Sequence, residues 1–373
     1  MEYWKSKMES MVDYLEFYRN KKVFITGHTG FKGSWMSLWL TNLGAKVKGY
    51  SLAPVYQDSL YELSKLSSVL HESVIENILN YEKLYKAVSD FSPDIIFHLA
   101  AQPLVKYSYS NPIETFQVNI QGTINVLEVV RTFKKPCTLV LITTDKVYEN
   151  KETIFPYREC DPLGGHDPYS SSKACAEIVS QSFLKSFFNP KFYDDHGVKL
   201  STARAGNVIG GGDWSADRLV PDIVRAFKND ENLILRYPNS VRPWQHVLEP
   251  INGYLKLAHF LSVTDPNKLN ASFNFGPHIL DNLKVIDLVQ QAQSFLGSGS
   301  YEIDTSFNKV HEAGLLKLDI SQAIDILNWH PLLNSKIAIE NTMLWYQSFY
   351  NDKTQIAEFT LNQINDFQQK IIK

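Results

Sequence analysis

The sequence lacks the features of secreted, membrane-spanning and nucleic-acid-binding proteins. Its 373 residues include only three cysteines, and no Cys-x-x-Cys spacing occurs, which argues against a disulfide framework and a zinc site. No apolar run approaches the length of a membrane span, and residues 1–20 are too rich in charge for a secretory signal. A formal net charge of -3 gives no electrostatic footprint for nucleic acid. We therefore expect a cytoplasmic protein that binds small molecules, with no metal, membrane or nucleic-acid partner.

Short runs rich in β-branched residues alternate with helical patterns from residue 21 to about 205. This alternation is typical of βαβ units and predicts a Rossmann-type, doubly wound parallel sheet, in which ligands bind at the carboxyl ends of the strands. Segments 34–43 and 118–133 carry apolar residues at helical spacing and are expected to be helices that pack on the sheet. The predicted strands lie near Lys22–Thr26, Lys46–Tyr50, Asp94–Leu99, Leu139–Thr143 and Lys199–Arg204.

The pattern loosens beyond residue 205 into Gly-rich loops, isolated strands and a few helices. We predict an N-terminal extension (1–20), a dinucleotide-binding Rossmann domain (21–205) and a smaller mixed α/β lobe (206–373). The second lobe is expected to bind mainly the substrate and to return some segments to the Rossmann domain. A cleft between two such lobes is the natural place for a substrate. Helices are expected in the second lobe near 221–228, 248–261, 285–295 and 321–327.

The first predicted strand ends in the turn Gly27-His-Thr-Gly30-Phe-Lys-Gly33. Glycines at a strand-to-helix turn allow a tight bend and bring a pyrophosphate close to the backbone and to the helix N-terminus. The turn therefore predicts a dinucleotide site, with an ordinary tight turn as the alternative. About twenty residues further on, where a carboxylate would bind the ribose of NAD, the chain has Ser51-Leu-Ala53-Pro54. That segment also lacks an Arg for the 2′-phosphate of NADP, which favours NAD.

Tyr169 and Lys173 stand four positions apart in a helical run and suggest redox chemistry on a sugar-like alcohol. A free phenol with a pKa of about 10 is a poor base at neutral pH, and an ammonium one turn away stabilises the phenolate. The same spacing also occurs by chance on solvated helices. Thr144, Asp145 and Lys146 follow another predicted strand, and a hydroxyl, a carboxylate and an ammonium in succession are more typical of a site than of a core.

These motifs together resemble the extended short-chain dehydrogenase/reductase family, and within it the nucleotide-sugar 4,6-dehydratases, most closely those that act on CDP-hexoses. The resemblance covers nearly the whole chain. It implies an NAD-dependent hydro-lyase of deoxysugar and lipopolysaccharide O-antigen biosynthesis. It rests on the glycine turn and on the segments Ala100-Ala-Gln-Pro-Leu-Val105, Arg204-Ala-Gly-Asn-Val-Ile-Gly-Gly-Gly-Asp-Trp214, Arg242-Pro-Trp-Gln-His-Val247 and Leu318-Asp-Ile-Ser-Gln-Ala323.

The resemblance also implies roles for individual residues. Thr144, Tyr169 and Lys173 would form the catalytic core common to the superfamily, and Asp145 and Lys146 would serve elimination. The implied cofactor-binding residues are Gly27, Thr29, Gly30, Phe31, Lys32, Gly33, Asn77, Ile78, Leu99, Ala100, Ala101, Asn119, Tyr169 and Lys173. The implied substrate-binding residues are Gln102, Asn207, Arg218, Leu219, Arg242 and Gln245, and Arg side chains in such a site pair with phosphate oxygens.

The implied reaction begins when Tyr169 removes the proton of the sugar 4-hydroxyl and a hydride passes to NAD+. The 4-ketone then acidifies the proton on carbon 5, water leaves across carbons 5 and 6 with Asp145 as the acid, and the hydride returns to carbon 6. Related dehydratases carry Asp-Glu where this chain has Asp145-Lys146. We hypothesise that Lys146 serves elimination, either as a neutral base at carbon 5 or as a cation that stabilises the enolate.

Two other functions stay open at this stage. A 4-epimerase of the same superfamily shares the Tyr-Lys pair but performs no elimination, so the Asp-Lys pair argues against it. A catalytically idle NAD-binding scaffold is favoured only by departures at the cofactor site, where Ala53 replaces the expected carboxylate and Asn77 replaces an Asp that contacts adenine in the family. The resemblance further implies a homodimer or a dimer of dimers, in which the Tyr169 helix contributes to a four-helix contact.

Overall fold

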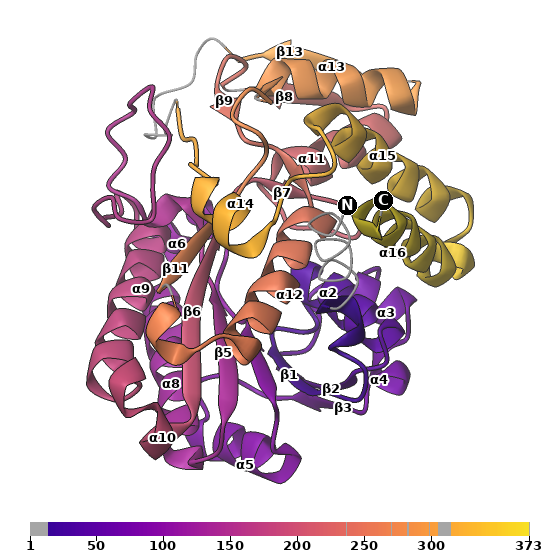
Figure 1. Ribbon diagram of the computed structural model, residues 1–373. Helices are drawn as coiled ribbons and strands as arrows, with labels where there is room; N and C mark the ends of the chain where they lie inside the picture. Colours follow the sequence, from indigo (N-terminus) through magenta and orange to yellow (C-terminus); the bar gives the residue numbers. More distant parts are fainter. Residues whose placement is uncertain are drawn as a thin grey trace, which may run out of the picture.

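Seven parallel strands form the centre of the fold (Figure 1), in a computed structural model that describes residues 14–235, 237–269, 271–281, 283–297, 299–304 and 315–372. The strands are β1 (Lys22–Thr26), β2 (Lys46–Ser51), β3 (Glu72–Ile75), β4 (Ile95–His98), β5 (Cys137–Ile142), β6 (Val198–Ala205) and β11 (Ser272–Phe275). Their order across the sheet is β11-β6-β5-β4-β1-β2-β3. The order reverses beside β1, which confirms the predicted Rossmann-type doubly wound sheet and marks the ligand-binding edge.

Helices cover both faces of this sheet (Figure 1). One layer contains α5 (Tyr81–Phe91), α8 (Gly122–Phe133) and α9 (Pro168–Ser186), and the other contains α2 (Phe31–Asn42) and α12 (Leu248–Val263). The layers follow from the alternation of side chains along the strands. Phe24 and Ile96 belong to a buried cluster with α5 and α8, whereas Ile25 and Phe97 belong to a second cluster with Trp35 of α2.

The five predicted strands are observed, with small differences at their ends. The predicted helix over 118–133 is divided into a π-helical turn, η1 (Gln117–Gln121), and α8, a local irregularity that is frequent at functional sites. Two strands, β3 and β11, were not predicted. Each has four residues and lacks the run of three apolar residues that marks β4, a strand of the same length.

In its described residues, the second lobe combines helices with three two-stranded sheets, in which β10 pairs with β7, β12 with β9 and β13 with β8. Part of its chain returns to the main sheet, because β11 pairs with β6 and α12 packs on β5 and β6. The division near residue 205 therefore stays a proposal. The remaining bounds are α3 (Leu60–Leu63), α4 (Leu66–Val69), α6 (Val105–Ser110), α7 (Pro112–Phe116), α10 (Tyr193–His196), β7 (Val208–Ile209), α11 (Leu219–Lys228), β8 (Asn232–Leu235), β9 (Val241–Arg242), β10 (Gln245–His246), β12 (Leu283–Lys284), α13 (Val285–Leu296), β13 (Ser300–Ile303), α14 (Ser321–Leu327), α15 (Ser335–Asn351) and α16 (Ile356–Ile372).

The described end of the N-terminal extension is anchored on α12, while residues 1–13 lie outside the described part of the chain. The Tyr14 hydroxyl donates to Asn252 Oδ1 (2.6 Å), and the Tyr18 hydroxyl donates to the carbonyl of Leu255 (2.6 Å). Within the described ranges, none of the helices has the length and apolarity needed to cross a membrane. The same ranges contain no group of three or more His, Cys, Asp or Glu side chains placed to hold a metal ion.

Candidate active site

The glycine turn between β1 and α2 leaves the N-terminus of α2 open to a ligand. Gly27 has a φ of +78°, and a Cβ there would lie 2.7 Å from the backbone nitrogen of Ala100. A Cβ on Gly33 would lie 2.0 Å from the carbonyl oxygen of Gly27, so both positions require glycine. No side chain caps α2 at Gly30, and its first turn has no acidic residue. Because free N–H groups at a helix start attract anions, this turn fits the diphosphate of a dinucleotide.

The predicted cofactor residues at the neighbouring strand ends lie along the same edge of the sheet. Thr29 Oγ1 donates to the carbonyl of Leu52 (2.8 Å) and shares a hydrogen bond with Ser51 Oγ (2.9 Å), so neutral groups occupy the end of β2. Asn77 Oδ1 accepts the N–H of Leu79 (2.9 Å) and thereby shapes the loop after β3. The other predicted cofactor residues in this region, Phe31, Ile78, Leu99, Ala100 and Ala101, lie at the start of α2 or in the loops after β3 and β4.

Asn119 and Gln102 use their buried side chains to hold the loop after β4. Asn119 Oδ1 accepts the N–H of Gln102 (2.8 Å), and its Nδ2 donates to the Gln102 carbonyl (3.0 Å) and to the Ser172 hydroxyl (2.8 Å). Gln102 Nε2 donates to Thr115 Oγ1 (2.8 Å). Neither residue lines the cavity described next. The structure therefore gives both a positioning role, and their contacts with ligands stay predictions.

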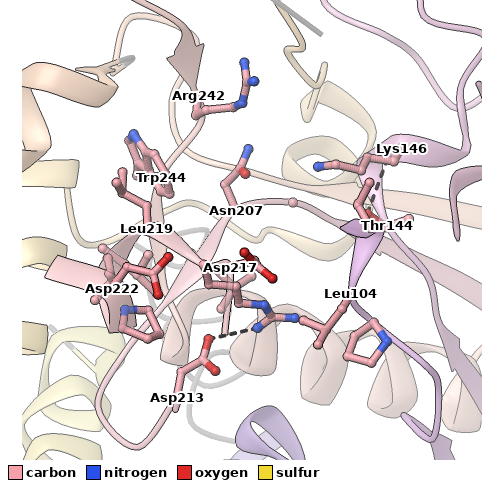
Figure 2. A pocket seen from close by; sticks show the side chains of 18 of the residues that line it. Leu104, Thr144, Lys146, Asn207, Asp213, Asp217, Leu219, Asp222, Arg242 and Trp244 are labelled. Atoms are coloured by element: carbon pink, nitrogen blue, oxygen red, sulfur yellow. Dashed lines mark hydrogen bonds and ion pairs between the residues drawn. The ribbon is translucent and has the colours of Figure 1, made fainter. Parts of the chain in front are cut away.

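A cavity of about 440 Å³ opens where β5 and β6 end, between the sheet and the second lobe. Figure 2 shows Thr144 and Lys146 on one side of this pocket, and Asn207, Arg242 and Trp244 on another. The location at the carboxyl ends of parallel strands agrees with the rule for doubly wound sheets. The predicted site residues that line the cavity are Lys32, Thr144, Asp145, Lys146, Tyr169, Asn207, Arg218, Leu219 and Arg242.

Tyr169 lies at the start of α9 and lines the cavity, with most of its surface buried. Burial raises the pKa of its phenol to about 12. Hydrogen bonding with Thr144 and the positive charge of Arg218 oppose this increase in pKa, whereas the charges of Asp145 and Asp167 add to it. The phenolate therefore depends on donors and cations that face the cavity.

Lys173 is anchored behind Tyr169 rather than exposed in the cavity. Its Nζ donates to the carbonyl of Ile142 at the end of β5 (3.1 Å), and Lys173 is not among the main groups that set the pKa of Tyr169. Burial lowers the pKa of Lys173 to about 8, an effect that the charge of Glu177 opposes. The sequence-based expectation that Lys173 lowers the Tyr169 pKa is not met, because burial disfavours the Lys173 ammonium and the carbonyl of Ile142 holds it.

A buried ion pair fixes α9 against the sheet one turn beyond Lys173. Arg204 of β6 donates to Glu177 through Nε (3.0 Å) and Nη2 (2.9 Å), and both side chains are fully buried. Thr143 Oγ1 at the end of β5 donates to the same carboxylate (2.5 Å). Because Glu177 shares a helix face with Lys173 and Tyr169, this pair sets the position of both relative to the ends of β5 and β6.

Asp145 directs an unpaired oxygen into a space that a glycine leaves open. Its Oδ1 accepts the hydrogen bond of Thr144 Oγ1 (2.9 Å) and lies 3.8 Å from Lys146 Nζ. Its Oδ2 is buried and has no hydrogen-bond partner among the described residues. A Cβ on Gly206 would lie 1.8 Å from that oxygen. The Lys146 side chain is 34% exposed, so its ammonium stands at the cavity surface beside a fully buried carboxylate.

The second lobe contributes polar side chains that suit a nucleotide. Arg218 Nη1 donates to Asp213 Oδ2 (2.8 Å), which holds the guanidinium at the cavity wall. Asn207 has a φ of +47°, and its Nδ2 is buried without a hydrogen-bond partner among the described residues. A buried donor of this kind is costly unless a ligand accepts from it. Arg242 is buried in the wall, and one of its nitrogens donates to the carbonyl of Val241 (3.0 Å).

Gln245, a predicted substrate-binding residue, does not line the cavity. Its Nε2 donates to the carbonyls of Gly206 and Phe275 (both 3.0 Å), which supports the loop that carries Gly206 beneath Asp145. Substrate contact by Gln245 stays a prediction.

Sequence reasoning missed three residues that shape the site: Glu177, Gly206 and Asp213. Glu177 had a readable signal, because it continues the four-residue spacing of Tyr169 and Lys173 along one helix face. Gly206 and Asp213 both lie in the segment Arg204–Trp214, but that segment does not show which residues they contact. Gly206 lies against Asp145, 61 positions earlier, and Asp213 accepts from Arg218, five positions later.

Comparisons with known proteins agree with this geometry. The sequence pattern of the family described as GDP-mannose 4,6 dehydratase matches residues 24–342. The CDP-glucose 4,6-dehydratase of Salmonella typhimurium is 47% identical over 333 residues, which are 89% of this chain and 92% of that protein. An epimerase structure from Methanothermobacter thermautotrophicus aligns with a TM-score of 0.77 and 21% identity, over 91% of this chain and 96% of that chain.

A dTDP-glucose 4,6-dehydratase structure from Bacillus anthracis, in complex with NAD, aligns with a TM-score of 0.72 and 20% identity. That alignment covers 88% of this chain and 97% of the other. At such identities these two structures support the fold alone, whereas the family pattern and the Salmonella relative span most of the chain. The chain belongs to the GDP-mannose 4,6 dehydratase family.

Proposed function

We propose that this protein catalyses the NAD-dependent 4,6-dehydration of a nucleotide hexose, converting CDP-glucose to CDP-4-keto-6-deoxyglucose and water. The observation that carries this proposal is one cavity in which Tyr169 and Thr144 stand beside the Asp145-Lys146 pair. Tyr169 and Thr144 suit the oxidation of an alcohol, and the Asp145-Lys146 pair suits an elimination. The choice of CDP-glucose follows the name of the Salmonella relative, which is 47% identical.

The glycine turn, Asn77 and the loop after β4 would hold the dinucleotide. When bound, NAD supplies the redox chemistry, because it accepts a hydride from carbon 4 of the sugar and returns it to carbon 6. The open N-terminus of α2 favours its diphosphate, and the neutral end of β2 leaves the adenine ribose without a carboxylate partner from Ser51 or Ala53.

Tyr169 acts first, as the base that takes the proton of the sugar 4-hydroxyl. Its raised pKa requires cavity groups that stabilise the phenolate, and Thr144 and Arg218 have that effect. Lys173 lies beneath the same helix turn, where the carbonyl of Ile142 holds its amine and the charge of Glu177 favours its ammonium form.

Lys146 and Asp145 then supply the two groups that elimination requires. Their Nζ and Oδ1 atoms are 3.8 Å apart, and a movement of about 1 Å brings them into hydrogen-bond contact. Transfer of one proton from the ammonium to the carboxylate gives a neutral amine and a carboxylic acid. The amine takes the proton from carbon 5, the acid protonates the departing 6-hydroxyl, and one water molecule leaves.

Thr144 completes the proton balance. The Lys146 ammonium returns its proton to carbon 5 as carbon 6 is reduced, which leaves Tyr169 protonated and Asp145 ionised. The Thr144 hydroxyl donates to Asp145 Oδ1 (2.9 Å) and is a hydrogen-bonding partner of Tyr169. Proton transfer from the phenol through Thr144 to Asp145 therefore restores both groups for the next turnover.

Incubation of the purified protein with NAD+ and a panel of nucleotide hexoses tests this function. A 4,6-dehydratase gives a 4-keto-6-deoxy sugar that absorbs in alkali, with CDP-glucose as the preferred substrate. A 4-epimerase gives the epimeric nucleotide sugar without that absorbance. Failure to convert any hexose, despite NAD binding, would favour an idle scaffold and overturn the proposal.

We also propose a homodimer or a dimer of dimers in the cytoplasm, with α7 and α9 in the contact. Large apolar side chains on these helices, and at the residue that ends α9, are exposed in the single chain: Ile113 (73%), Ile178 (55%) and Phe187 (47%). Exposed apolar side chains of this size often mark protein contacts. Light scattering should give an even multiple of 42.7 kDa, and Ile178→Lys should shift it toward the monomer.

A further inference from the structure

A carboxylate stands at the end of the cavity that lies opposite the catalytic residues. Figure 2 shows Thr144 and Lys146 at one end of the pocket, and Leu219, Asp222 and Trp244 at the other. Asp222 belongs to the first turn of α11, in the second lobe. The diphosphate of a nucleotide hexose separates its sugar from its nucleoside. A substrate whose sugar lies against Thr144 and Lys146 therefore extends its nucleoside toward Asp222.

Helix geometry and an ion pair fix the position of Asp222. Its backbone N–H donates to the carbonyl of Arg218 (3.0 Å), so the two residues lie one turn apart on the same helix face. Arg225 Nη2 donates to Asp222 Oδ1, and Arg225 Nη1 donates to the carbonyl of Trp214 (3.0 Å). The Asp222 side chain is partly exposed and lines the cavity, so its carboxylate is held in place where a ligand can reach it.

The surroundings of Asp222 suit a flat ring. Leu219 and Trp244 line the same end of the pocket (Figure 2). Ile234 of β8 and Val285 of α13 also line the cavity, and both of these elements pack on α11. Ligand pockets bury a ring among apolar and aromatic side chains, while a few polar groups determine which ring fits. Asp222 is such a polar group at this end of the pocket.

We propose that the Asp222 carboxylate accepts a hydrogen bond from the exocyclic amine of a cytosine base and thereby selects against uracil and thymine, an inference that rests on the proposed function. An ionised carboxylate can only accept hydrogen bonds, and its charge strengthens those that it accepts. Cytosine carries an amine at carbon 4, where thymine and uracil carry a carbonyl oxygen. That oxygen would face the carboxylate with no proton between them, which leaves two acceptors unpaired and weakens binding.

Isothermal titration of the full chain with CDP and with UDP measures this selection. The wild type should bind CDP about tenfold to a hundredfold more tightly than UDP. Asp222→Asn carries both a donor and an acceptor on one uncharged amide, so its CDP-to-UDP affinity ratio should fall close to one. The amide oxygen can still accept from Arg225, which preserves the contact within α11. Asp90→Asn, at an exposed aspartate that pairs with Lys86 on α5, is the matched control.

Steady-state kinetics should place the effect in binding rather than in chemistry. Asp222 lies at the end of the pocket away from Thr144 and Lys146. Loss of its hydrogen bond therefore weakens the ground state and the transition state equally. With CDP-glucose, Asp222→Asn should raise KM about tenfold or more and keep kcat near the wild-type value.

The affinity ratio decides the proposal. A folded Asp222→Asn protein with the wild-type ratio would overturn the role of Asp222, and so would a wild type that binds CDP and UDP equally. Equal weakening of CDP and UDP in the variant would mean that the carboxylate binds the ribose, which both nucleotides share, and would overturn selection of the base. Absence of nucleotide binding or of CDP-glucose conversion by the wild type would instead overturn the proposed function as well.

Discussion

Replacing Gly206 with alanine tests whether the position of the Asp145 carboxylate controls elimination. The added Cβ would lie 1.8 Å from Asp145 Oδ2 and 2.1 Å from Cγ. Ordinary contact requires about 3.5 Å, so the carboxylate or the loop must move by roughly 1.7 Å. Because a displacement of about 1 Å from the reactive geometry costs about 100-fold in rate, we expect kcat to fall at least 100-fold.

The assay separates elimination from oxidation. Formation of the 4-keto-6-deoxy product reports the whole reaction, whereas NADH absorbance in a single turnover reports oxidation at carbon 4, which Asp145 does not perform. Gly276→Ala is the matched control, because a Cβ there lies 3.6 Å from Leu318 Cβ, which is ordinary contact. A Gly206→Ala protein that unfolds at the wild-type temperature and forms product at the wild-type rate would refute this reasoning.

Two further predictions concern stability. Glu177→Gln should lower the free energy of unfolding by about 3–5 kcal/mol, because it leaves the buried Arg204 guanidinium without its carboxylate. Glu128→Gln, which breaks a partly exposed pair with Arg131, is the control and should cost less than about 1 kcal/mol. If urea unfolding gives the two variants equal losses of unfolding free energy, the prediction is wrong. Burial raises the pKa of Glu249 to about 8 in the folded state. The carboxyl therefore stays neutral when folded but ionises when unfolded, and stability decreases as the pH rises from 5 to 8. Glu249→Gln should remove up to about 4 kcal/mol of this pH-dependent loss of stability. If wild type and variant lose stability in parallel as the pH rises, Glu249 is not its cause.

The parts of the site that the sequence predicts are those encoded by local pattern. Glycine spacing between a strand and a helix places Gly27 to Gly33, and the end of a β-branched run places Thr144 to Lys146. Parallel strands bring their carboxyl ends to one edge, so these segments meet without knowledge of any distant contact. Tyr169 joins them because its helix packs beside the same strands.

The parts that escape prediction depend on long-range packing. The strand β11 has four residues and pairs with β6, about seventy positions earlier in the chain, so its own sequence carries little signal. The direction of the Lys173 ammonium follows from the carbonyl of Ile142, and the space beneath Asp145 follows from Gly206. Such features arise from backbone geometry at contacts between elements, which residue type and spacing do not specify.

A single-turnover reaction of Lys146→Ala with NAD+ and CDP-glucose tests the assignment of elimination most directly. Lys151→Ala, at an exposed lysine that pairs with Glu149 on the surface, is the control and should behave like the wild type. If Lys146 serves elimination, the variant forms NADH at a rate near that of the wild type and gives no 4-keto-6-deoxy product. Loss of NADH formation together with the product, or normal formation of the product, would contradict the assignment.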